Sequence, residues 1–418
     1  MDLTDKFKLV APYVKQENVW EDYVDLATRY SPVNLGMGYA DFLPPQHIID
    51  ALIQTLSSEN PMLHQYTIAH GHPRLVTALS KLYSPLLNRA IDPNEEIIAC
   101  AGAYGALYST IMGHIQQGDE VIIMEPFFDC YELMVAAAKG TPKFIPLRFK
   151  ENNTCQTGKW VLDFQELDKL FNNKTKAIIL NTPHNPLGKV FDEMELLQIA
   201  QLCKKWNVMC IADEVYEWLV YEPKRHIKIA SLPGMWERTI TIGSGGKTFC
   251  ITGWRVGWAV GPKHLIKNLQ AEPAFISPTF IQEAIAIGIE KELARLEQDD
   301  CYLKSLGRSL QLKKDYLFEV LREIGMKPIS TDAGIFLLAD WTPLEEKADL
   351  SFEKDAYKDM QFTKWFTKNV GVLMIPVSIF YSEARKGLGE NFVRLCFIKN
   401  DECLQKVAKI LRDWKRST

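Results

Sequence analysis

Short apolar runs alternate with helical segments between about residues 95 and 260, and this alternation constrains the fold more than any other feature of the sequence. Seven runs, rich in β-branched and other apolar residues, have the length and composition of strands; they lie at 96–101, 121–124, 143–147, 177–180, 208–212, 239–242 and 256–260. Helical periodicity separates several of them, as in 102–115 and 193–205. Such alternation predicts an α/β fold with a mostly parallel sheet covered by helices on both faces.

The pattern changes after about residue 295. A long helix is predicted over 302–324, followed by short strands at 335–338, 372–375 and 392–396 and by a last helix capped by Asp401. A chain of 418 residues is also too long for one simple core. We therefore predict a large α/β domain over 46–295, a smaller α+β domain over 296–418, and an irregular N-terminal arm over 1–45 that packs with the small domain.

Composition excludes several classes of protein. Basic residues number 48 and acidic residues 52, a formal charge of −4, which predicts no nucleic-acid surface. No apolar run is long enough to predict a membrane span. Residues 1–6 lack the apolar core of a signal peptide, so we expect a cytoplasmic protein and leave a mitochondrial form from another start site open.

The nine cysteines form no Cys-x-x-Cys pair and are expected to be free thiols, and His70 with His72 is a weak metal pair.

Unusual residues follow four of the predicted strands. In open α/β sheets, ligands bind outside the carboxyl ends of the strands. Taken singly, Asp213 could cap a helix, Asn185 could form a turn, and Lys247 could be a surface lysine in a glycine-rich turn. Their shared place at one edge of one sheet favours a ligand site instead. The residues at these strand ends are Gly102 with Ala103, Asn185, Asp213 with Tyr216, and Ser244 with Lys247.

Three chemistries could use Lys247, and counting removes one of them. A P-loop needs a glycine five residues before the glycine that precedes its lysine; that position is Thr241, and Gly243 lies two residues too late. A nicotinamide site is also excluded, because no Gly-x-Gly-x-x-Gly follows an early strand. Two alternatives therefore remain for Lys247: a Schiff-base lysine and an ordinary surface lysine. An aldehyde cofactor with a pyridine ring and a phosphate needs such a lysine and a buried carboxylate at the ring nitrogen, where Asp213 is suitably placed.

Several motifs together resemble the fold type I aminotransferases, which depend on pyridoxal 5'-phosphate. They are 181–188 (NTPHNPLG), 212–216 (ADEVY), 244–249 (SGGKTF) and 253–258 (GWRVGW). Within that family, 34–38 (NLGMG) and 125–132 (EPFFDCYE) are most similar to the kynurenine aminotransferase group, also called glutamine transaminase K or cysteine-S-conjugate β-lyase. The resemblance covers nearly the whole chain, from Trp20 to the last helix. It implies a fold type I transferase that binds pyridoxal phosphate and forms a homodimer.

The resemblance also implies roles for the matching residues. Lys247 would form the Schiff base and move the proton at the substrate α-carbon, and Asp213 would pair with the pyridine nitrogen. Arg394 would clamp the substrate α-carboxylate. The other cofactor contacts would come from Asn185 and Tyr216 at the phenolic oxygen, Phe128 on the ring, Gly102, Ala103, Ser244 and Arg255 at the phosphate, and Tyr66 at the phosphate of the neighbouring subunit. The substrate pocket would also include Gly38, Trp20, Tyr104 and Asn185.

Two of these roles make physical sense. Burial and nearby cations should lower the pKa of Lys247, because its amine must be free part of the time. Arg394 lies in an otherwise apolar strand, where an unpaired charge is costly. A substrate carboxylate would remove that cost, and so would an internal salt bridge.

The predicted reaction is transfer of an amino group from an aromatic or sulfur-containing L-amino acid to a 2-oxo acid, in a ping-pong sequence through pyridoxamine phosphate. Kynurenine, glutamine, methionine and phenylalanine are the expected donors. β-Elimination or other α-carbon chemistry at the same site is an alternative, and a non-catalytic regulator that kept the fold is a more distant one.

The segment 269–279 is shorter than expected of the family at the dimer contact, and Ile276 replaces a more polar or aromatic residue there. His184 stands where relatives often have Asn, with no catalytic effect expected. These departures leave the side-chain preference open.

Overall fold

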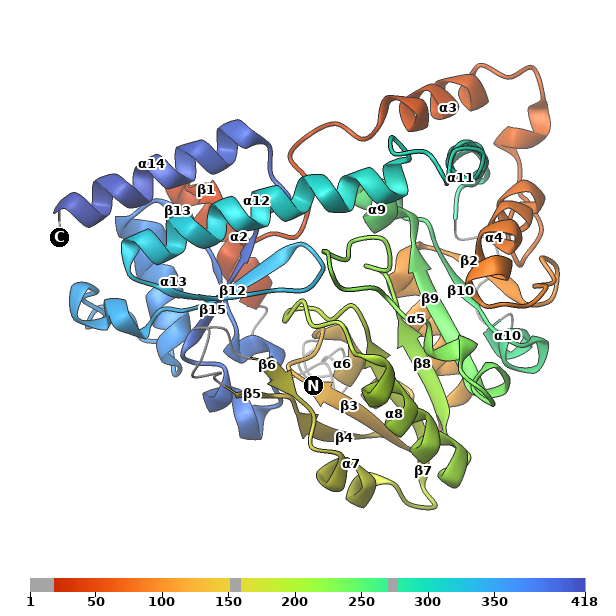
Figure 1. Cartoon of the computed structure of the whole chain (residues 1–418), viewed down its shortest axis with the longest axis horizontal. Coiled ribbons are helices and arrows are strands. Elements are labelled where there is room, and N and C mark those ends of the chain that lie inside the picture. Colours follow the sequence, from red (N-terminus) through yellow and green to blue (C-terminus); the bar gives the residue numbers. More distant parts are fainter. Residues whose placement is uncertain (1–18, 151–158, 270–276, 418) are drawn as a thin grey trace, which may run out of the picture.

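A seven-stranded sheet lies at the centre of the computed structural model, which describes residues 19–150, 159–269 and 277–417 (Figure 1). The strand order is β2-β10-β9-β8-β7-β3-β4. Of the seven strands, β10 alone runs opposite to the other six, so the predicted mostly parallel sheet is confirmed. The strands are β2 (Ile97–Cys100), β3 (Glu120–Glu125), β4 (Thr141–Pro146), β7 (Thr175–Asn181), β8 (Met209–Asp213), β9 (Thr239–Ser244) and β10 (Gly257–Val260).

Helices cover both faces of this sheet because its strands are apolar on both sides. In β7, Ala177 and Ile179 join one buried cluster, whereas Ile178 and Leu180 join another on the opposite face. The first face is covered by α5 (Gly102–His114), α6 (Cys130–Ala137) and α10 (Lys263–Leu269), and the second by α7 (Phe164–Leu170) and α8 (Glu193–Trp206). A third helical group packs at the β2–β10 end; it contains α3 (Gln46–Leu56), α4 (Pro73–Leu86) and α11 (Thr279–Leu293).

The C-terminal part of the chain forms a second sheet, which is antiparallel and has the order β11-β12-β15-β14. Its strands are β11 (Lys327–Ile329), β12 (Phe336–Asp340), β14 (Ile375–Pro376) and β15 (Phe392–Cys396). Its helices are α12 (Tyr302–Ile324), α13 (Lys358–Asn369) and α14 (Asp401–Ser417), and α12 lies alongside α14 (Figure 1). The expected cap of α14 is wrong: Asp401 is its first residue, and Oδ1 of Asn400 accepts a 2.7 Å hydrogen bond from the Cys403 amide.

The expectation of an irregular arm is wrong for residues 19–30, which form α2 (Val19–Tyr30) with Tyr23 and Leu26 buried. This helix packs on α13, and β1 (Val33–Asn34) pairs in parallel with β13 (Val372–Leu373). The described part of the arm therefore lies against the C-terminal part of the chain. The domain boundaries at 45 and 295 stay predictions.

The rest of the described chain contains shorter elements. They are the hairpin of β5 (Arg148–Lys150) and β6 (Lys159–Val161), the one-turn helix α9 (Gly245–Thr248), and the 3₁₀ turns η2 (Pro61–His64), η3 (Ile229–Ser231), η4 (Trp236–Arg238), η5 (Thr252–Trp254), η6 (Thr342–Lys347), η7 (Ser378–Phe380) and η8 (Glu383–Leu388).

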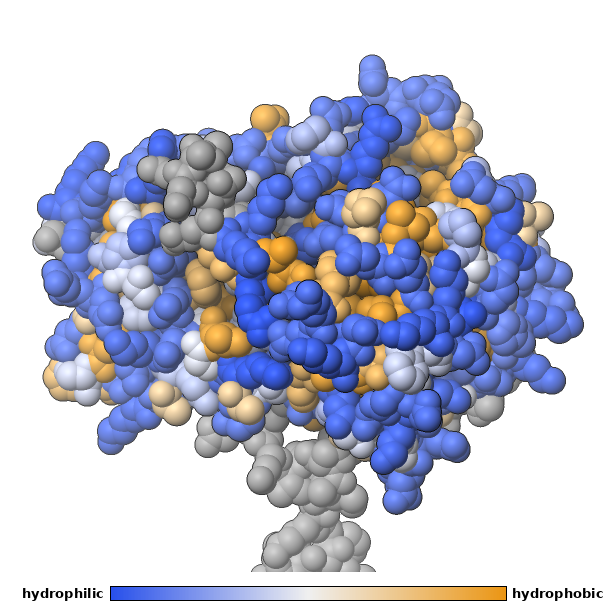
Figure 2. Space-filling model, turned by 60° about the horizontal axis from the view of Figure 1, so that its bottom comes forward, coloured by the Kyte–Doolittle hydropathy of each residue, from blue (hydrophilic) through white to orange (hydrophobic). Residues whose placement is uncertain are grey.

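The polar surface and the free thiols are what the composition predicts. The face in Figure 2 is largely hydrophilic, with apolar residues exposed in separate smaller areas. The eight cysteines that the structure describes are all free, and six of them are buried. Among the described helices, none has both the length and the apolarity that crossing a bilayer requires.

Candidate active site

A cavity of about 280 Å3 opens at the carboxyl edge of the large sheet and is closed on its other side by the C-terminal sheet and the N-terminal arm. Twelve of the predicted site residues line it: Trp20, Gly38, Ala103, Tyr104, Phe128, Asn185, Asp213, Tyr216, Ser244, Lys247, Arg255 and Arg394. Gly102 lies beside it, in contact range of Arg255. Tyr66 lies elsewhere, is 84% exposed, and lines a separate open cavity with residues 63–67 and 277–280.

Lys247 follows β9 and points its amine into the cavity. Its Nζ donates a 3.1 Å hydrogen bond to the carbonyl oxygen of Gly38 and lies 5.7 Å from the centre of the Tyr216 ring. Burial lowers the pKa of Lys247, and the nearby charges of Arg394 and Arg255 act in the same direction. No ion pair with a carboxylate involves Lys247 within the described residues. The surface-lysine alternative is therefore wrong, and the lowered pKa is what a nucleophilic amine requires.

Asp213 ends β8 and is only 3% exposed. The hydroxyl of Tyr131 donates a 2.5 Å hydrogen bond to its Oδ2, and the Val215 amide donates to its Oδ1 at 3.4 Å. Asp213 therefore forms a local turn and does not cap a helix. Burial raises the pKa of Asp213 to about 6, and the two hydrogen bonds oppose that rise. Sequence reasoning missed Tyr131, although it lies within the quoted motif at 125–132.

Two asparagines join the ends of neighbouring strands. Oδ1 of Asn181 accepts a 2.7 Å hydrogen bond from the Asn185 amide, and its Nδ2 donates to the carbonyl oxygen of Asp213 at 3.0 Å. Asn185 is thereby held above the sheet edge, where its Oδ1 accepts a 3.2 Å hydrogen bond from Nη1 of Arg394. Asn181 was also missed, and the one signal for it was its place at the start of the motif at 181–188.

Arg394 enters the same cavity from β15 and is 3% exposed. Its Nη2 donates to the carbonyl oxygen of Gly36 at 3.3 Å, whereas its buried Nε has no partner among the described residues. The guanidinium carbon lies 3.9 Å from the Phe336 ring centre and 4.6 Å from that of Phe380. Burial lowers the pKa of Arg394 to about 10. The structure shows no ion pair of Arg394 with any described carboxylate, so the internal salt bridge is not formed and the site suits an incoming carboxylate.

The start of α5 is suited to bind an anion, and we call its first amides, together with Arg255 and Ser244, the anion cradle. Its N-cap residue, Ala101, has no side chain that could satisfy the first amides, and its first turn carries no acid. The guanidinium of Arg255 lies beside these amides and donates to the carbonyl oxygens of Thr252 (3.0 Å) and Ala101 (3.4 Å). Gly102 has φ +74°, and a Cβ there would lie 2.6 Å from Nη2 of Arg255. Free amides, a guanidinium and the nearby Ser244 hydroxyl are a suitable donor set for a phosphate.

Comparison with known proteins agrees with this geometry. Residues 30–411 match the family model of the class I and II aminotransferases. The chain belongs to this family. Kynurenine–oxoglutarate transaminase 3 of Bos taurus is 48% identical to the aminotransferase over 405 residues, which cover 96% of this chain and 88% of that protein. Kynurenine–oxoglutarate transaminase 1 of Homo sapiens is 42% identical, with coverage of 95% and 96%.

Solved structures show the same fold. Bna3p of Saccharomyces cerevisiae, a candidate kynurenine aminotransferase, superimposes with a TM-score of 0.89 at 30% identity and covers 98% of this chain and 100% of its own. The predicted family, the α/β fold of type I and the transaminase activity are therefore confirmed.

No group of three His, Cys, Asp or Glu side chains among the described residues could hold a metal ion, and His72 instead contacts Glu283.

Proposed function

We propose that this aminotransferase binds pyridoxal 5'-phosphate in the cavity and moves the amino group of an aromatic or sulfur-containing L-amino acid, such as kynurenine, glutamine, methionine or phenylalanine, to a 2-oxo acid. The observation that carries the proposal is the convergence of Lys247 and Arg394 on one cavity from two different parts of the chain. One is an amine with a lowered pKa, and the other is a buried guanidinium without an anionic partner in the described chain.

The residues present fit the cofactor at each of its polar groups. The free amides at the start of α5, Arg255 and Ser244 would bind the phosphate, and Asp213 would hold the proton on the pyridine nitrogen. Asn185 and Tyr216 line the cavity where they would donate to the phenolic oxygen, and Phe128 lines it as the aromatic partner of the ring. When bound, the cofactor supplies an aldehyde carbon for the substrate nitrogen and a cationic ring that stabilises negative charge at the α-carbon.

The chain itself would then bind the substrate and move its proton. Arg394 would bind the α-carboxylate through two parallel hydrogen bonds, which fixes the α-carbon in the cavity. Lys247 would take the α-proton as a general base when its Nζ is not joined to the cofactor. Its lowered pKa leaves a fraction of neutral amine for this role. Tyr131 would keep the Asp213 carboxylate oriented throughout.

An aromatic or sulfur-containing substrate side chain suits the remaining walls. Trp20, Tyr104 and Phe336 line the cavity, and Gly38 leaves room beside Phe336, since a Cβ there would lie 2.6 Å from the Phe336 ring. The Trp20 indole is fixed by a 2.5 Å hydrogen bond to Oδ2 of Asp129. The names of the related transaminases support kynurenine as the first donor to test.

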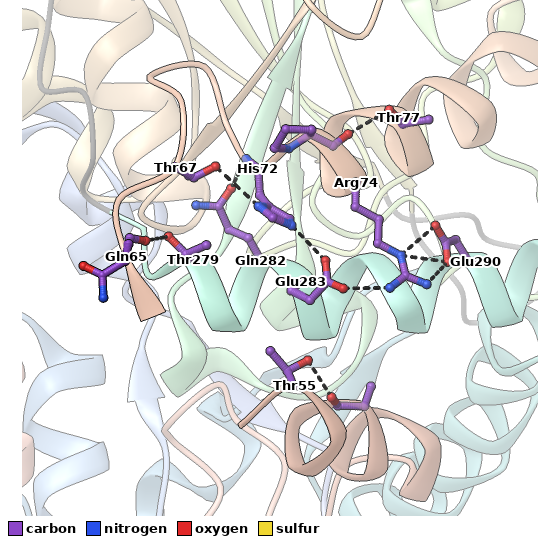
Figure 3. Close-up of polar contacts among 12 residues, drawn as sticks. Thr55, Gln65, Thr67, His72, Arg74, Thr77, Thr279, Gln282, Glu283 and Glu290 are labelled. Atoms are coloured by element: carbon purple, nitrogen blue, oxygen red, sulfur yellow. Dashed lines mark hydrogen bonds and ion pairs between the residues drawn. The ribbon is translucent and has the colours of Figure 1, made fainter. Parts of the chain in front are cut away.

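We also propose a homodimer in which Tyr66 reaches the phosphate of the neighbouring site. The loop that carries Tyr66 is fixed on α11 by polar contacts (Figure 3): Thr279 Oγ1 donates to the Gln65 carbonyl at 2.6 Å, and the His72 amide donates to Gln282 Oε1 at 2.7 Å. Arg74 adds ion pairs to Glu283 and Glu290. A loop anchored on α11 with an 84% exposed tyrosine suits a role in a second subunit. Of the segment 269–279, residues 270–276, including Ile276, lie outside the described residues. A cytoplasmic location, with a mitochondrial form left open, stays a prediction.

A half-reaction tests the proposal. Purified holoenzyme is mixed with each amino acid in the absence of a 2-oxo acid, and the absorbance of the bound cofactor is followed. We expect a stoichiometric change with kynurenine, glutamine, phenylalanine or methionine that 2-oxo acid reverses, and we expect Lys247→Ala to lose it. Release of pyruvate and ammonia from a cysteine conjugate without amino exchange would instead identify a β-lyase. A cofactor absorbance that no amino acid changes would identify a non-catalytic protein.

A further inference from the structure

Residues 36–39 form a loop whose four consecutive carbonyl oxygens all accept hydrogen bonds from buried or partly buried cations; we name it the carbonyl loop. It follows β1 and borders the cavity at Gly38. The cations come from β15, from the residues after β15, and from α9. The bonds are Arg394 Nη2 to the Gly36 oxygen (3.3 Å), Lys247 Nζ to the Gly38 oxygen (3.1 Å), and Lys399 Nζ to the Tyr39 and Met37 oxygens (2.8 and 3.4 Å).

The loop is seated tightly, and only glycine fits at two of its positions. A Cβ on Gly36 would lie 2.2 Å from Leu373 Cδ2, and one on Gly38 would lie 2.6 Å from Phe336 Cζ. Oδ1 of Asn34 accepts 3.0 Å hydrogen bonds from the Gly36 and Met37 amides. The Met37 carbonyl oxygen also accepts a 3.0 Å hydrogen bond from the Tyr39 amide. Among the described residues, the carbonyl oxygens of Gly36, Gly38 and Tyr39 have only the three cations as donors.

Two of the three cations belong to the reaction. Lys247 and Arg394 line the cavity, and the proposed function uses the first at the cofactor and the α-proton and the second at the substrate carboxylate. The contact of Lys247 with the cofactor competes with the hydrogen bond that its Nζ gives to the Gly38 oxygen, and Arg394 must share its N–H groups between the Gly36 oxygen and the substrate carboxylate. A buried carbonyl that loses its donor costs about 1–3 kcal/mol, so the loop would loosen in the loaded enzyme unless another contact held it.

Lys399 is the third cation and does not line the cavity. It is 2% exposed, and its ammonium lies 4.2 Å from the centre of the Tyr39 ring. The described part of the chain gives it no carboxylate partner. A buried ammonium is costly without compensation, so its two carbonyl acceptors are what make this burial tolerable. Lys399 therefore keeps its hydrogen bonds to the carbonyl loop when Lys247 and Arg394 contact the cofactor and the substrate.

We propose that Lys399 is a positioning residue that holds the carbonyl loop, and with it the Gly38 wall of the substrate pocket, while Lys247 and Arg394 engage the cofactor and the amino acid. The inference rests on the proposed function, because that function sets the roles of the two cavity cations. Lys399 acts through the loop, so it should affect binding of the amino donor more than the rate of the bound complex.

The test compares Lys399→Met with Lys364→Met in the holoenzyme. Lys364 is the matched control, a largely buried lysine of α13 whose ammonium pairs with Asp355 (2.7 Å) and Asp22 (3.1 Å), neither of which belongs to the carbonyl loop. We expect Lys399→Met to raise the KM for amino donors roughly 10-fold with kcat within about 3-fold, since a hydrogen bond to a charged group contributes about 1.5–3 kcal/mol. Lys364→Met should lower the midpoint of thermal unfolding and leave KM unchanged.

A second readout does not depend on turnover. Amide hydrogen exchange of the carbonyl loop is measured in holoenzyme with and without excess 2-oxoglutarate, which cannot donate an amino group. In the wild type the loop should stay protected in both states, and in Lys399→Met its exchange should accelerate at least about 10-fold, most of all with the oxo acid bound. If Lys399→Met does not fold, Lys399→Gln, which keeps a polar end group, takes its place with the same expectations.

Unchanged KM and unchanged loop exchange in the Lys399 variant, with an active wild type, would overturn the role of Lys399 alone. A wild type that shows no half-reaction with any amino acid would instead overturn the proposed function, whatever the Lys399 variant does.

Discussion

The hydroxyl of Tyr131 donates a 2.5 Å hydrogen bond to Oδ2 of Asp213, and both of these buried residues line the cavity. Burial raises the pKa of Asp213 to about 6, while the tyrosine hydroxyl lowers it. Burial and the neighbouring Asp213 raise the pKa of Tyr131 well above its ordinary value, so its proton stays on the phenol. The pair therefore favours an ionised carboxylate at neutral pH in a place where burial alone would favour the acid.

Tyr131→Phe should move the acid limb of the rate profile upward. Loss of the donated hydrogen bond raises the pKa of Asp213 further, and about 1.5–3 kcal/mol for a bond to a charged group corresponds to about one to two pH units. Activity should stay within about 3-fold of wild type near pH 8 and fall about 10-fold near pH 6. The measurement is kcat/KM against pH, with Tyr108→Phe, outside the cavity, as the control. An unshifted acid limb would show that Tyr131 does not set the charge of Asp213.

Asp213→Asn should stabilise the cofactor-free protein at neutral pH. Because the folded pKa of about 6 lies above the ordinary value of 3.8, the acid contributes stability below pH 3.8 that is lost as pH rises through about 6. The difference of about 2 units corresponds to at most about 3 kcal/mol, which asparagine would no longer lose. Urea unfolding should show a gain near pH 7.5 that shrinks toward pH 4, and transamination should be abolished. Asp168→Asn, at a half-exposed side chain, should give no such pH-dependent gain.

Arg394→Met should separate substrate binding from stability. The guanidinium has a buried Nε without a partner and pairs with no carboxylate of the described residues, so its removal relieves an uncompensated buried charge. Its removal also takes the donor from the Gly36 carbonyl oxygen, which costs about 1–3 kcal/mol, so the two effects should offset and leave the free energy of unfolding of the substrate-free enzyme nearly unchanged. Loss of a buried, bidentate carboxylate contact costs about 2–5 kcal/mol, so kcat/KM for amino donors should fall roughly 30- to 5000-fold. Steady-state kinetics and thermal unfolding measure the two effects. A strongly destabilised variant would indicate a structural role for the arginine.

Local sequence rules found the residues that follow strands, and they missed the residues that reach them from elsewhere. Lys247, Asp213 and Asn185 were predictable because the carboxyl ends of parallel strands share one edge of a sheet. Tyr131 contacts Asp213 from 82 positions away, a pairing that depends on how α6 packs against the sheet. Lys399 gave no signal either, because its acceptors lie about 360 residues earlier in the chain.

Element types were predicted well in the large sheet and less well where short segments change partners. The apolar run at 372–375 was expected as one strand, yet Val372 and Leu373 pair with β1, whereas Ile375 and Pro376 pair with β15. Nothing in a uniformly apolar run marks the point where the chain leaves one sheet for another. The helix α2 was missed for a similar reason: its buried face is completed by α13, more than 300 residues later, where Tyr23 contacts Thr363.

Gly102→Ala should weaken cofactor binding by disturbing the anion cradle. The new Cβ would lie 2.6 Å from Nη2 and 2.9 Å from Cζ of Arg255, so the guanidinium must leave its place beside the first amides of α5. Displacing one charged hydrogen-bond donor costs about 1.5–3 kcal/mol, which predicts a roughly 10- to 100-fold higher Kd for pyridoxal phosphate. Gly118→Ala is the control for backbone strain alone. Gly118 also has a positive φ (+96°), but beyond its chain neighbours no described residue has an atom within 4 Å of the place that a methyl group would take. Both variants should lose some stability, and only Gly102→Ala should lose affinity in a cofactor titration of the apoenzyme. Equal affinities in the two variants would place the phosphate elsewhere.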